Sequence, residues 1–194
     1  FRDLEILETI MKETDRYIKD FSGSCKLEER FEFRYILPEE GDQAARIEQI
    51  CFPPNEACTE KMMIDRAAAA PELFLVAADR EKGQLAGFLC GLATDEERFR
   101  DEFFYDNTLY RPEGKNVILL GLDVLPEYRG QGVAKELMCR YLQKERERGR
   151  KKAILTCLED KIPMYEKMGF TRQGLSRSVW GGIPWYEMSC RLNS

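Results

Sequence analysis

The sequence of 194 residues contains no histidine. This absence excludes Ser-His-Asp and Cys-His catalytic triads, haem ligation through histidine and nearly every catalytic zinc site. A proton that moves in a reaction must therefore pass through a carboxylate, a tyrosine, a cysteine, a lysine or water. We expect no metal site in this chain.

Long apolar runs and an excess of positive charge are also missing. No run is long enough to cross a membrane, no signal-peptide pattern opens the chain, and the formal net charge of −5 argues against nucleic acid as a partner. The seven cysteines are odd in number and form no C-x-x-C pair, so we predict free thiols and no disulfide framework. Cys58, which follows a turn, is predicted to be the most exposed thiol. We therefore expect a cytoplasmic protein without a membrane partner.

The order of hydrophobic patterns predicts one α/β domain. Residues 3–21 form an amphipathic helical pattern that is broken at 22–24, so residues 1–24 are interpreted as an N-terminal helical extension. Two packing partners stay open for this extension, namely the domain itself and a second subunit of a homodimer. Residues 25–194 are expected to form a single domain, because a chain of 194 residues suits one well-packed core.

Strand and helix patterns alternate along that domain. Strands are predicted at 31–37, 73–78, 85–93, 116–124, 153–158 and 185–190, with one more strand after Phe170. Helices are predicted at 42–52, from Thr59 to Pro71, at 132–148 and at 163–168. The charged segment 96–105 is predicted to be a helix or a flap. Because the strand at 116–124 is almost continuously apolar, both of its faces should be covered.

The segment between the strand at 116–124 and the helix at 132–148 carries the clearest chemical signal. It reads Pro-Glu-Tyr-Arg-Gly-Gln-Gly-Val-Ala over residues 126–134. Gly130 and Gly132 let the backbone approach a ligand closely, and the N–H groups that open the helix carry partial positive charge. Arg129 adds a full charge. Such a helix N-terminus suits an anion such as a pyrophosphate.

Two other motifs and a purely structural turn compete with this interpretation. A dinucleotide fingerprint, G-x-G-x-x-G, fails because its third glycine position is Lys135, and a Walker loop fails because G-K-[S/T] is absent. A simple tight turn before a helix remains as the alternative. The joint occurrence of Arg129, both glycines, Ala134 and a preceding apolar strand favours the anion site over that turn.

The same segment resembles the GNAT superfamily of acetyl-CoA-dependent N-acetyltransferases. Its motif [Q/R]-x-x-G-x-[G/A] is matched by Arg129, Gly132 and Ala134, within the longer pattern L-x-V-x-P-x-Y-R-G-x-G that starts at Leu122. Segments 95–99 and 157–170 are similar to those of the arylalkylamine (serotonin) N-acetyltransferase branch and its bacterial relatives. The resemblance implies an α/β (α+β) fold with a mixed, mostly antiparallel central sheet flanked by helices, to which this chain adds an N-terminal helix.

The resemblance also implies direct transfer of an acetyl group from acetyl-CoA to a small primary amine. Backbone amides of Leu122 and Val124 would bind the cofactor arm and polarise the thioester carbonyl. Tyr165 matches the tyrosine that protonates the departing thiolate, and a phenol suits that role because its pKa of about 10 lies above that of a thiol, about 8.5. The cofactor-binding set implied in this way is Leu122, Asp123, Val124, Arg129, Gly130, Gln131, Gly132, Val133, Ala134 and Lys135.

The chain departs from the arylalkylamine branch at the proton relay. Two histidines on the fourth strand of that branch correspond to Ile118 and Leu120, which cannot move a proton. Asp123 lies on the same strand, but strand geometry points it away from Leu120 unless a bulge re-aims it. The acidic residues after the fifth strand, Glu159 and Asp160, are further candidates. The remaining alternative is an amine that enters already neutral.

The acceptor site is expected among aromatic residues near loops, although core packing explains these residues equally well. We predict Phe52, Pro53, Phe88 and Tyr186 as acceptor-binding residues, with Trp180 and Trp185 as further candidates. The acidic segment at 95–102 could attract a cationic amine or simply be a solvated face. Two functional alternatives stay open, namely acetylation of a protein N-terminus or lysine, and a catalytically weak acetyl-CoA sensor.

Overall fold

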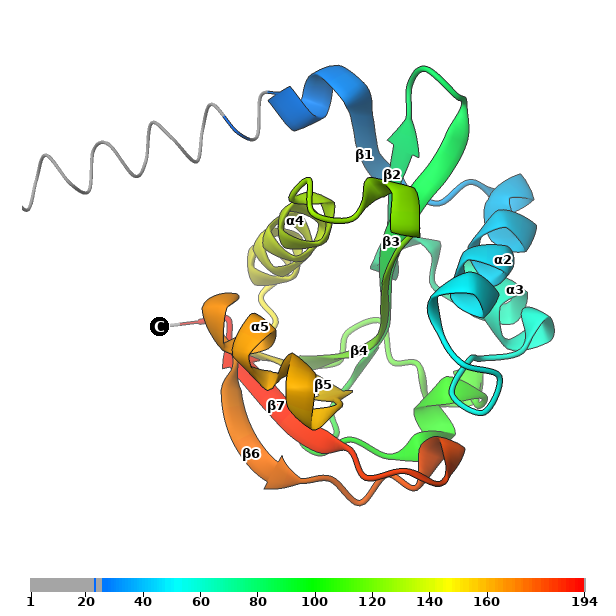
Figure 1. The fold of residues 1–194 in the computed structure, drawn as a ribbon. Coiled ribbons are helices and arrows are strands. Elements are labelled where there is room, and N and C mark those ends of the chain that lie inside the picture. Colours follow the sequence, from blue (N-terminus) through cyan, green and yellow to red (C-terminus); the bar gives the residue numbers. More distant parts are fainter. Residues whose placement is uncertain (1–22, 24–25, 194) are drawn as a thin grey trace, which may run out of the picture.

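The computed structural model describes residue 23 and residues 26–193, so the predicted N-terminal extension lies outside the described residues except for Gly23. The described chain forms one sheet of seven strands in the order β1-β2-β3-β4-β5-β7-β6 (Figure 1). Only β4 and β5 run parallel, and every other neighbouring pair is antiparallel. The strands are β1 (Phe31–Tyr35), β2 (Phe74–Asp79), β3 (Gln84–Thr94), β4 (Asn116–Val124), β5 (Lys152–Cys157), β6 (Thr171–Leu175) and β7 (Tyr186–Arg191). The mixed, mostly antiparallel sheet expected from the sequence is confirmed.

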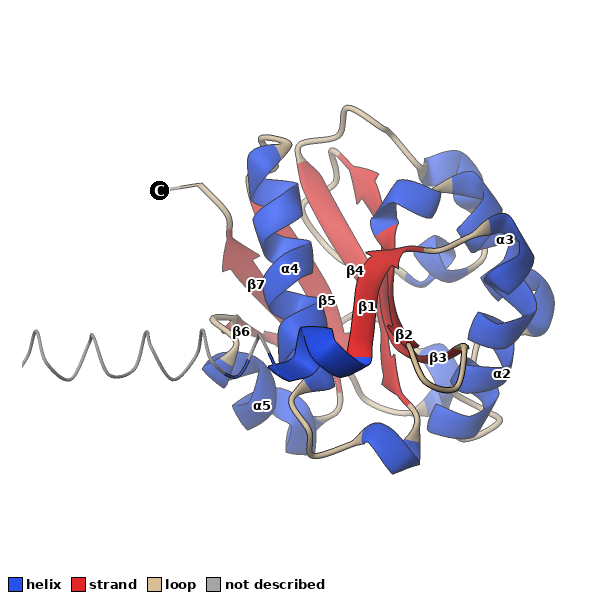
Figure 2. Ribbon diagram, turned by 90° about the horizontal axis from the view of Figure 1, so that it is seen from above, coloured by secondary structure: helices blue, strands red, loops and turns tan. Residues whose placement is uncertain are grey.

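Helices cover both faces of the sheet. Seen from above, α2 and α3 lie on one side of the central strands and α4 lies on the other (Figure 2). The helices are α2 (Gly41–Cys51), α3 (Glu60–Ala69), α4 (Val133–Glu147) and the short α5 (Ile162–Lys167). Among the described residues, no helix combines the length and the apolar character needed to cross a bilayer.

Local sequence signals define where several elements begin and end. The hydroxyl of Thr59 accepts a hydrogen bond of 3.2 Å from the N–H of Met62, which starts α3 as predicted. Gly149, with φ of +80°, ends α4. The apolar strand predicted at 116–124 is β4 itself. The charged segment 96–105 is neither a long helix nor a free flap, because Phe99 and Phe103 are buried and hold it against the core.

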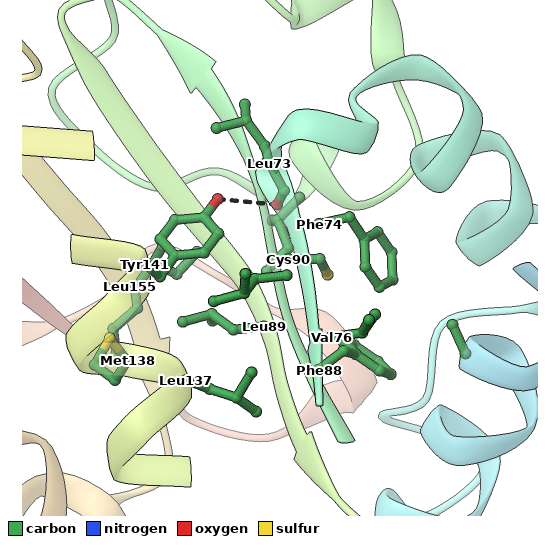
Figure 3. Packing of buried hydrophobic residues seen from close by; sticks show 14 of the residues in the cluster. Leu73, Phe74, Val76, Phe88, Leu89, Cys90, Leu137, Met138, Tyr141 and Leu155 are labelled. Atoms are coloured by element: carbon green, nitrogen blue, oxygen red, sulfur yellow. Dashed lines mark hydrogen bonds between the residues drawn. The ribbon is translucent and has the colours of Figure 1, made fainter. Parts of the chain in front are cut away.

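The core lies on both sides of the central strands (Figure 3). On the side of α2, the rings of Phe74 and Phe88 pack with centroids 5.0 Å apart. On the side of α4, Leu89 meets Leu137, and the hydroxyl of Tyr141 donates a hydrogen bond of 3.0 Å to the carbonyl of Leu73. Both faces of β4 are therefore covered, as its continuous apolar run predicted.

The cysteines are free thiols at all six described positions, whereas Cys25 lies outside the described residues. The prediction that Cys58 is the most exposed thiol is wrong, because Cys58 is only 1% exposed and its sulfur lies 3.6 Å from the guanidinium of Arg66. Its backbone N–H donates to the carboxylate of Glu48 on α2, which folds the turn onto the sheet. The exposed thiol is Cys139, on the solvent side of α4.

Candidate active site

Strands β4 and β5 pair only over their first residues. The parallel register joins Asn116–Ile118 to Lys152–Ile154, and after Ile118 the two strands separate. The diverging ends, with the loop after β4 and with α5, line two adjoining cavities. The separation thus opens the sheet at its centre, beside the segment that carries the sequence motif.

The outer cavity, which we call the cofactor groove, has a volume of about 530 Å³. It lies between the end of β4, the start of α4 and α5. Nine of the predicted cofactor-binding residues line it: Leu122, Asp123, Val124, Arg129, Gly130, Gly132, Val133, Ala134 and Lys135. Gln131 is the exception, since its side chain is exposed and its amide donates to the carbonyl of Glu127 at 3.1 Å. The structure therefore gathers nearly the whole predicted set along one groove.

The loop before α4 has the geometry that an anion site needs. Gly130 and Gly132 have φ of +74° and +90°, a region that favours glycine. A Cβ at Gly130 would meet no protein atom within 4 Å, so the space beside the loop is open. Because α4 begins at Val133, the N–H groups of Val133 and Ala134 have no carbonyl partner within the helix. These dipoles and the exposed Arg129 make the groove positive at this end.

The inner cavity, which we call the acceptor cavity, is smaller, about 120 Å³, and is rich in aromatic side chains. Phe52, Phe104, Trp180 and Trp185 line it. The rings of Phe104 and Trp180 lie 4.5 Å apart between centroids, and each indole N–H donates to a backbone carbonyl, at 2.7 Å for Trp180 and 2.8 Å for Trp185. Rigid aromatic walls of this kind suit a small apolar or aromatic group.

Tyr165 lines both cavities, together with Leu122, Phe52 and Lys161. It comes from α5, where its ring packs edge-on against Phe170 with centroids 5.9 Å apart. Burial, more than the nearby Cys157 and Asp123, raises the pKa of the Tyr165 hydroxyl above its ordinary value. The phenol therefore stays protonated at neutral pH and lies where the two cavities meet. This is the position that a proton donor to a leaving thiolate requires.

Several predicted residues lie outside both cavities. Phe88 is fully buried in the core against Phe74, because strand alternation turns it under α2, so its assignment to the acceptor site does not hold. Pro53 is exposed on the loop after α2, and Tyr186 stands on β7 with the guanidinium of Arg172 5.3 Å from its ring centroid. Of the four predicted acceptor-binding residues, Phe52 alone lines a cavity.

The predicted acidic candidates after β5 also point elsewhere. Glu159 and Asp160 have side chains about 71% and 69% exposed, and they approach Arg172 and Lys161 at 3.9 Å and 3.3 Å. Neither lines a cavity. In the acidic segment, Asp101 accepts the backbone N–H of Val179 at 3.0 Å, which ties the segment to the aromatic loop.

Two carboxylates that the sequence did not single out, Glu48 and Glu56, line the acceptor cavity. Helix periodicity in the sequence could have identified Glu48. Glu48 follows Ala44 and Ala45 on the buried stripe of α2, where an apolar residue is expected, whereas Ile50 is 59% exposed. A charged residue on a buried stripe is a functional signal.

A β-bulge in β4 changes where Asp123 points. In the register with β3, Gly121 pairs with Cys90 and Leu119 pairs with Gly91, so Leu120 is an extra residue. Ile118 and Asp123 pair with Leu92 and Phe88, four residues apart on β3, and hence share the face that meets α2. Without the bulge they would face opposite sides. The bulge therefore places Asp123 on the face of Ile118, while Leu122, its neighbour in the strand, stays on the opposite face.

No group of three or more metal-ligating side chains comes together within residues 23 and 26–193. The cofactor groove instead offers backbone N–H groups and one arginine, which suit a phosphorylated organic ligand. The acceptor cavity beside it offers aromatic walls, two glutamate side chains and one partly buried phenol.

The family model and the curated relative that match this chain agree on its family. A family model described as the acetyltransferase (GNAT) family matches residues 41–170. The chain is 31% identical to serotonin N-acetyltransferase from Mesocricetus auratus over 166 residues, which are 83% of this chain and 77% of that protein.

Solved structures share the fold at lower identity. The loading GNATL domain of CurA from Lyngbya majuscula has a TM-score of 0.72 at 14% identity, covering 84% of this chain and 98% of that one. The GphF GNAT-like decarboxylase in complex with isobutyryl-CoA has a TM-score of 0.70 at 17% identity, covering 84% and 100%. The family match spans β4, the loop before α4 and Tyr165, which together build the two cavities. The chain therefore belongs to the acetyltransferase (GNAT) family and is an N-acetyltransferase.

Proposed function

We propose that this enzyme transfers an acetyl group from acetyl-CoA directly to a small primary amine. The observation that carries the proposal is the meeting of the two cavities at Tyr165. One cavity has an anion-binding helix start, and the other has aromatic walls with carboxylates. A single phenol lies between them, where acyl donor and acceptor would have to meet.

The cofactor groove supports acetyl-CoA as the co-substrate. The first-turn N–H groups of Val133 and Ala134, with Arg129 at the rim, would hold the pyrophosphate. Leu122 and Val124 lie on the stretch of β4 that has separated from β5, so their backbone can serve the cofactor arm. Bound in this way, acetyl-CoA supplies a thioester whose carbonyl accepts an amine. The structural relative with isobutyryl-CoA, an acyl-CoA thioester, supports the same assignment.

The acceptor cavity supports a small amine. A free volume of about 120 Å³ between Phe52, Trp180 and Trp185 suits one small group. Glu48 and Glu56 supply negative charge for an ammonium group. The serotonin N-acetyltransferase relative is named for an aromatic amine, which supports an arylalkylamine-like acceptor here.

Tyr165 would return a proton to the sulfur as the thioester opens. Its raised pKa makes it a donor that remains protonated until a thiolate forms beside it. The backbone N–H groups along the end of β4 would polarise the carbonyl. The amine loses one proton before it attacks and a second as it becomes an amide.

The test is release of free thiol from acetyl-CoA across a panel of amines and peptides. We expect turnover with small primary amines and little with peptides. Turnover with peptides alone would establish the protein-directed alternative. Stabilisation by acetyl-CoA without turnover of any acceptor would establish the sensor alternative. No stabilisation by acetyl-CoA would contradict all of these functions.

A further inference from the structure

Two buried carboxyl groups interact between α2 and the sheet, from Glu48 on α2 and Asp123 on β4. Both residues are buried, at 3% and 1% exposed. One oxygen of Glu48, Oε1, accepts the backbone N–H of Cys58 at 2.8 Å. Oε2 of Glu48 and both oxygens of Asp123 receive no hydrogen bond from a donor group among the described residues. Unpaired buried carboxylate oxygens are costly, so such a pair calls for an explanation.

The pair shares one proton. Burial, and after it the nearby charge of Glu48, raise the pKa of Asp123 well above its usual range. Two like charges at this spacing in a buried site cannot both be ionised cheaply. The proton that the pair retains therefore rests on Asp123.

Among the described residues, no ion pair joins Glu48 or Asp123 to a lysine or arginine. The buried Arg66 nearby is held instead by the carbonyl of Phe104, at 2.8 Å, and by cysteine sulfurs. Glu48 lines the acceptor cavity, and its buried Oε2 receives no hydrogen bond from a donor group among the described residues.

We infer that Glu48 is the base that accepts the ammonium proton of the acceptor amine, and that Asp123 is a positioning residue that holds this carboxylate through the shared proton. The inference rests on the proposed amine acetylation. The β4 bulge brings Asp123 to the face of Ile118, which is the face that meets α2 and Glu48.

The proton and group transfers balance. The ammonium proton moves to Glu48 and then to solvent. The neutral nitrogen forms a bond to the carbonyl carbon, and the carbon–sulfur bond breaks. The sulfur takes the proton of the Tyr165 hydroxyl, and the second proton lost by the nitrogen restores that hydroxyl. The products are an amide, a thiol and one proton.

The titratable groups that neighbour the pair are not expected to produce an acidic limb in a profile of kcat/KM against pH. The groups that face the pair are Cys51, Cys58, Cys90, Arg66, Lys161 and Tyr165. Burial raises the pKa of Cys58 to about 11 and that of Cys90 to about 12, and it also raises those of Cys51 and Tyr165. The three thiols and the Tyr165 phenol therefore stay protonated through the neutral range.

The first experiment is Glu48→Gln, measured as kcat/KM against pH with the amine found in the panel. The amide oxygen can still accept from the Cys58 N–H, so the variant should fold. We expect a loss of about 100-fold at neutral pH, within the range for a general base. The loss should shrink towards about pH 10, where a primary amine is increasingly neutral without help. Stabilisation by acetyl-CoA should match that of the wild type.

The second experiment compares Asp123→Asn with Asp123→Ala. Asparagine can still donate to Glu48, so the acidic limb should stay near its wild-type position. Alanine cannot donate a hydrogen bond to Glu48, so the acidic limb of kcat/KM should move to higher pH. This comparison stands even if Glu48→Gln fails to fold. Glu81→Gln, on the distant β2–β3 turn, is the matched control.

Three outcomes would overturn the inference while the proposed function stands. These are wild-type kcat/KM in Glu48→Gln, a loss that is equal at every pH, and a pH-dependent loss found in Glu56→Gln instead. An identical limb in both Asp123 variants would overturn the positioning role. If the wild type releases no thiol with any amine, the proposed function fails and this inference fails with it.

Discussion

The hydroxyl of Tyr128 donates a hydrogen bond of 2.7 Å to Oδ2 of Asp79. This contact ties the loop before α4 to the β2–β3 turn, where Oδ1 of Asp79 accepts the backbone N–H groups of Glu81 and Lys82 at 2.9 Å and 3.2 Å. The Tyr128 hydrogen bond is the main cause of a lowered pKa at Asp79. The glycine loop therefore rests on a buried ionised carboxylate.

Tyr128→Phe should lower the free energy of unfolding by about 2 kcal/mol at neutral pH, the size expected for a hydrogen bond to a charged group. Because the folded-state pKa of Asp79 is lowered, its stabilisation is present above the unfolded value of about 3.9 and is lost as pH falls through the folded value. The difference between wild type and variant should therefore shrink in acid. Urea unfolding at several pH values measures this difference in the free energy of unfolding. Tyr105→Phe, whose side chain is exposed, is the control, and a difference independent of pH would contradict the assignment.

Tyr165→Phe should reduce turnover by about 100-fold or more, since general acid catalysis contributes on this scale. The ring packing against Phe170 is kept, so folding and acetyl-CoA binding should change little. Steady-state thiol release and thermal unfolding with and without acetyl-CoA measure the two effects. Tyr35→Phe on β1, outside both cavities, is the control. An unchanged rate would remove the proton-donor role.

Gly132→Ala should weaken acetyl-CoA binding. At a hundredfold excess over its dissociation constant, a ligand stabilises the fold by about 2.7 kcal/mol. Gly132 has φ of +90° at the start of α4, and Gly149 has φ of +80° at its end, so alanine strains the backbone at both positions. Both variants should lose about 1 kcal/mol of stability. Only Gly132→Ala should also lose most of the acetyl-CoA stabilisation, and an equal loss in Gly149→Ala would contradict the position of the anion site.

Thiol labelling should separate Cys139 from Cys58. Cys139 is exposed on α4, whereas Cys58 is buried and its pKa is raised to about 11. Because the thiolate is the reactive form, native protein should be labelled at Cys139 and protected at Cys58, and denatured protein should be labelled at both. Mass spectrometry of the modified peptides measures this. Rapid native labelling of Cys58 would contradict the packing of its turn.

Elements with a strong local signal were predictable from the sequence. The apolar run at 116–124 became β4, Thr59 began α3, and Gly149 ended α4, because each depends on neighbours within a few residues. The glycine loop was predictable for the same reason. Its φ values and the first turn of α4 are local backbone properties, so nearly the whole predicted cofactor set lies along one groove.

Only the tertiary structure decided which residues line the acceptor cavity. An aromatic residue looks the same in a sequence whether it lines a cavity, as Trp180 does, or fills the core, as Phe88 does. The burial of Cys58 depends on Glu48, which lies on another element.

By itself, then, the sequence determined the family, the order of elements and the glycine loop before α4, because these follow from short-range pattern. Only the tertiary structure decided where the acceptor cavity lies and which carboxyl groups reach it. A one-residue bulge at Leu120 is defined by the register with β3, and that register turns Asp123 towards α2 and Glu48. Strand pairing depends on residues that are distant in the sequence. The face to which a side chain points beyond a bulge therefore cannot be predicted from alternation along its own strand.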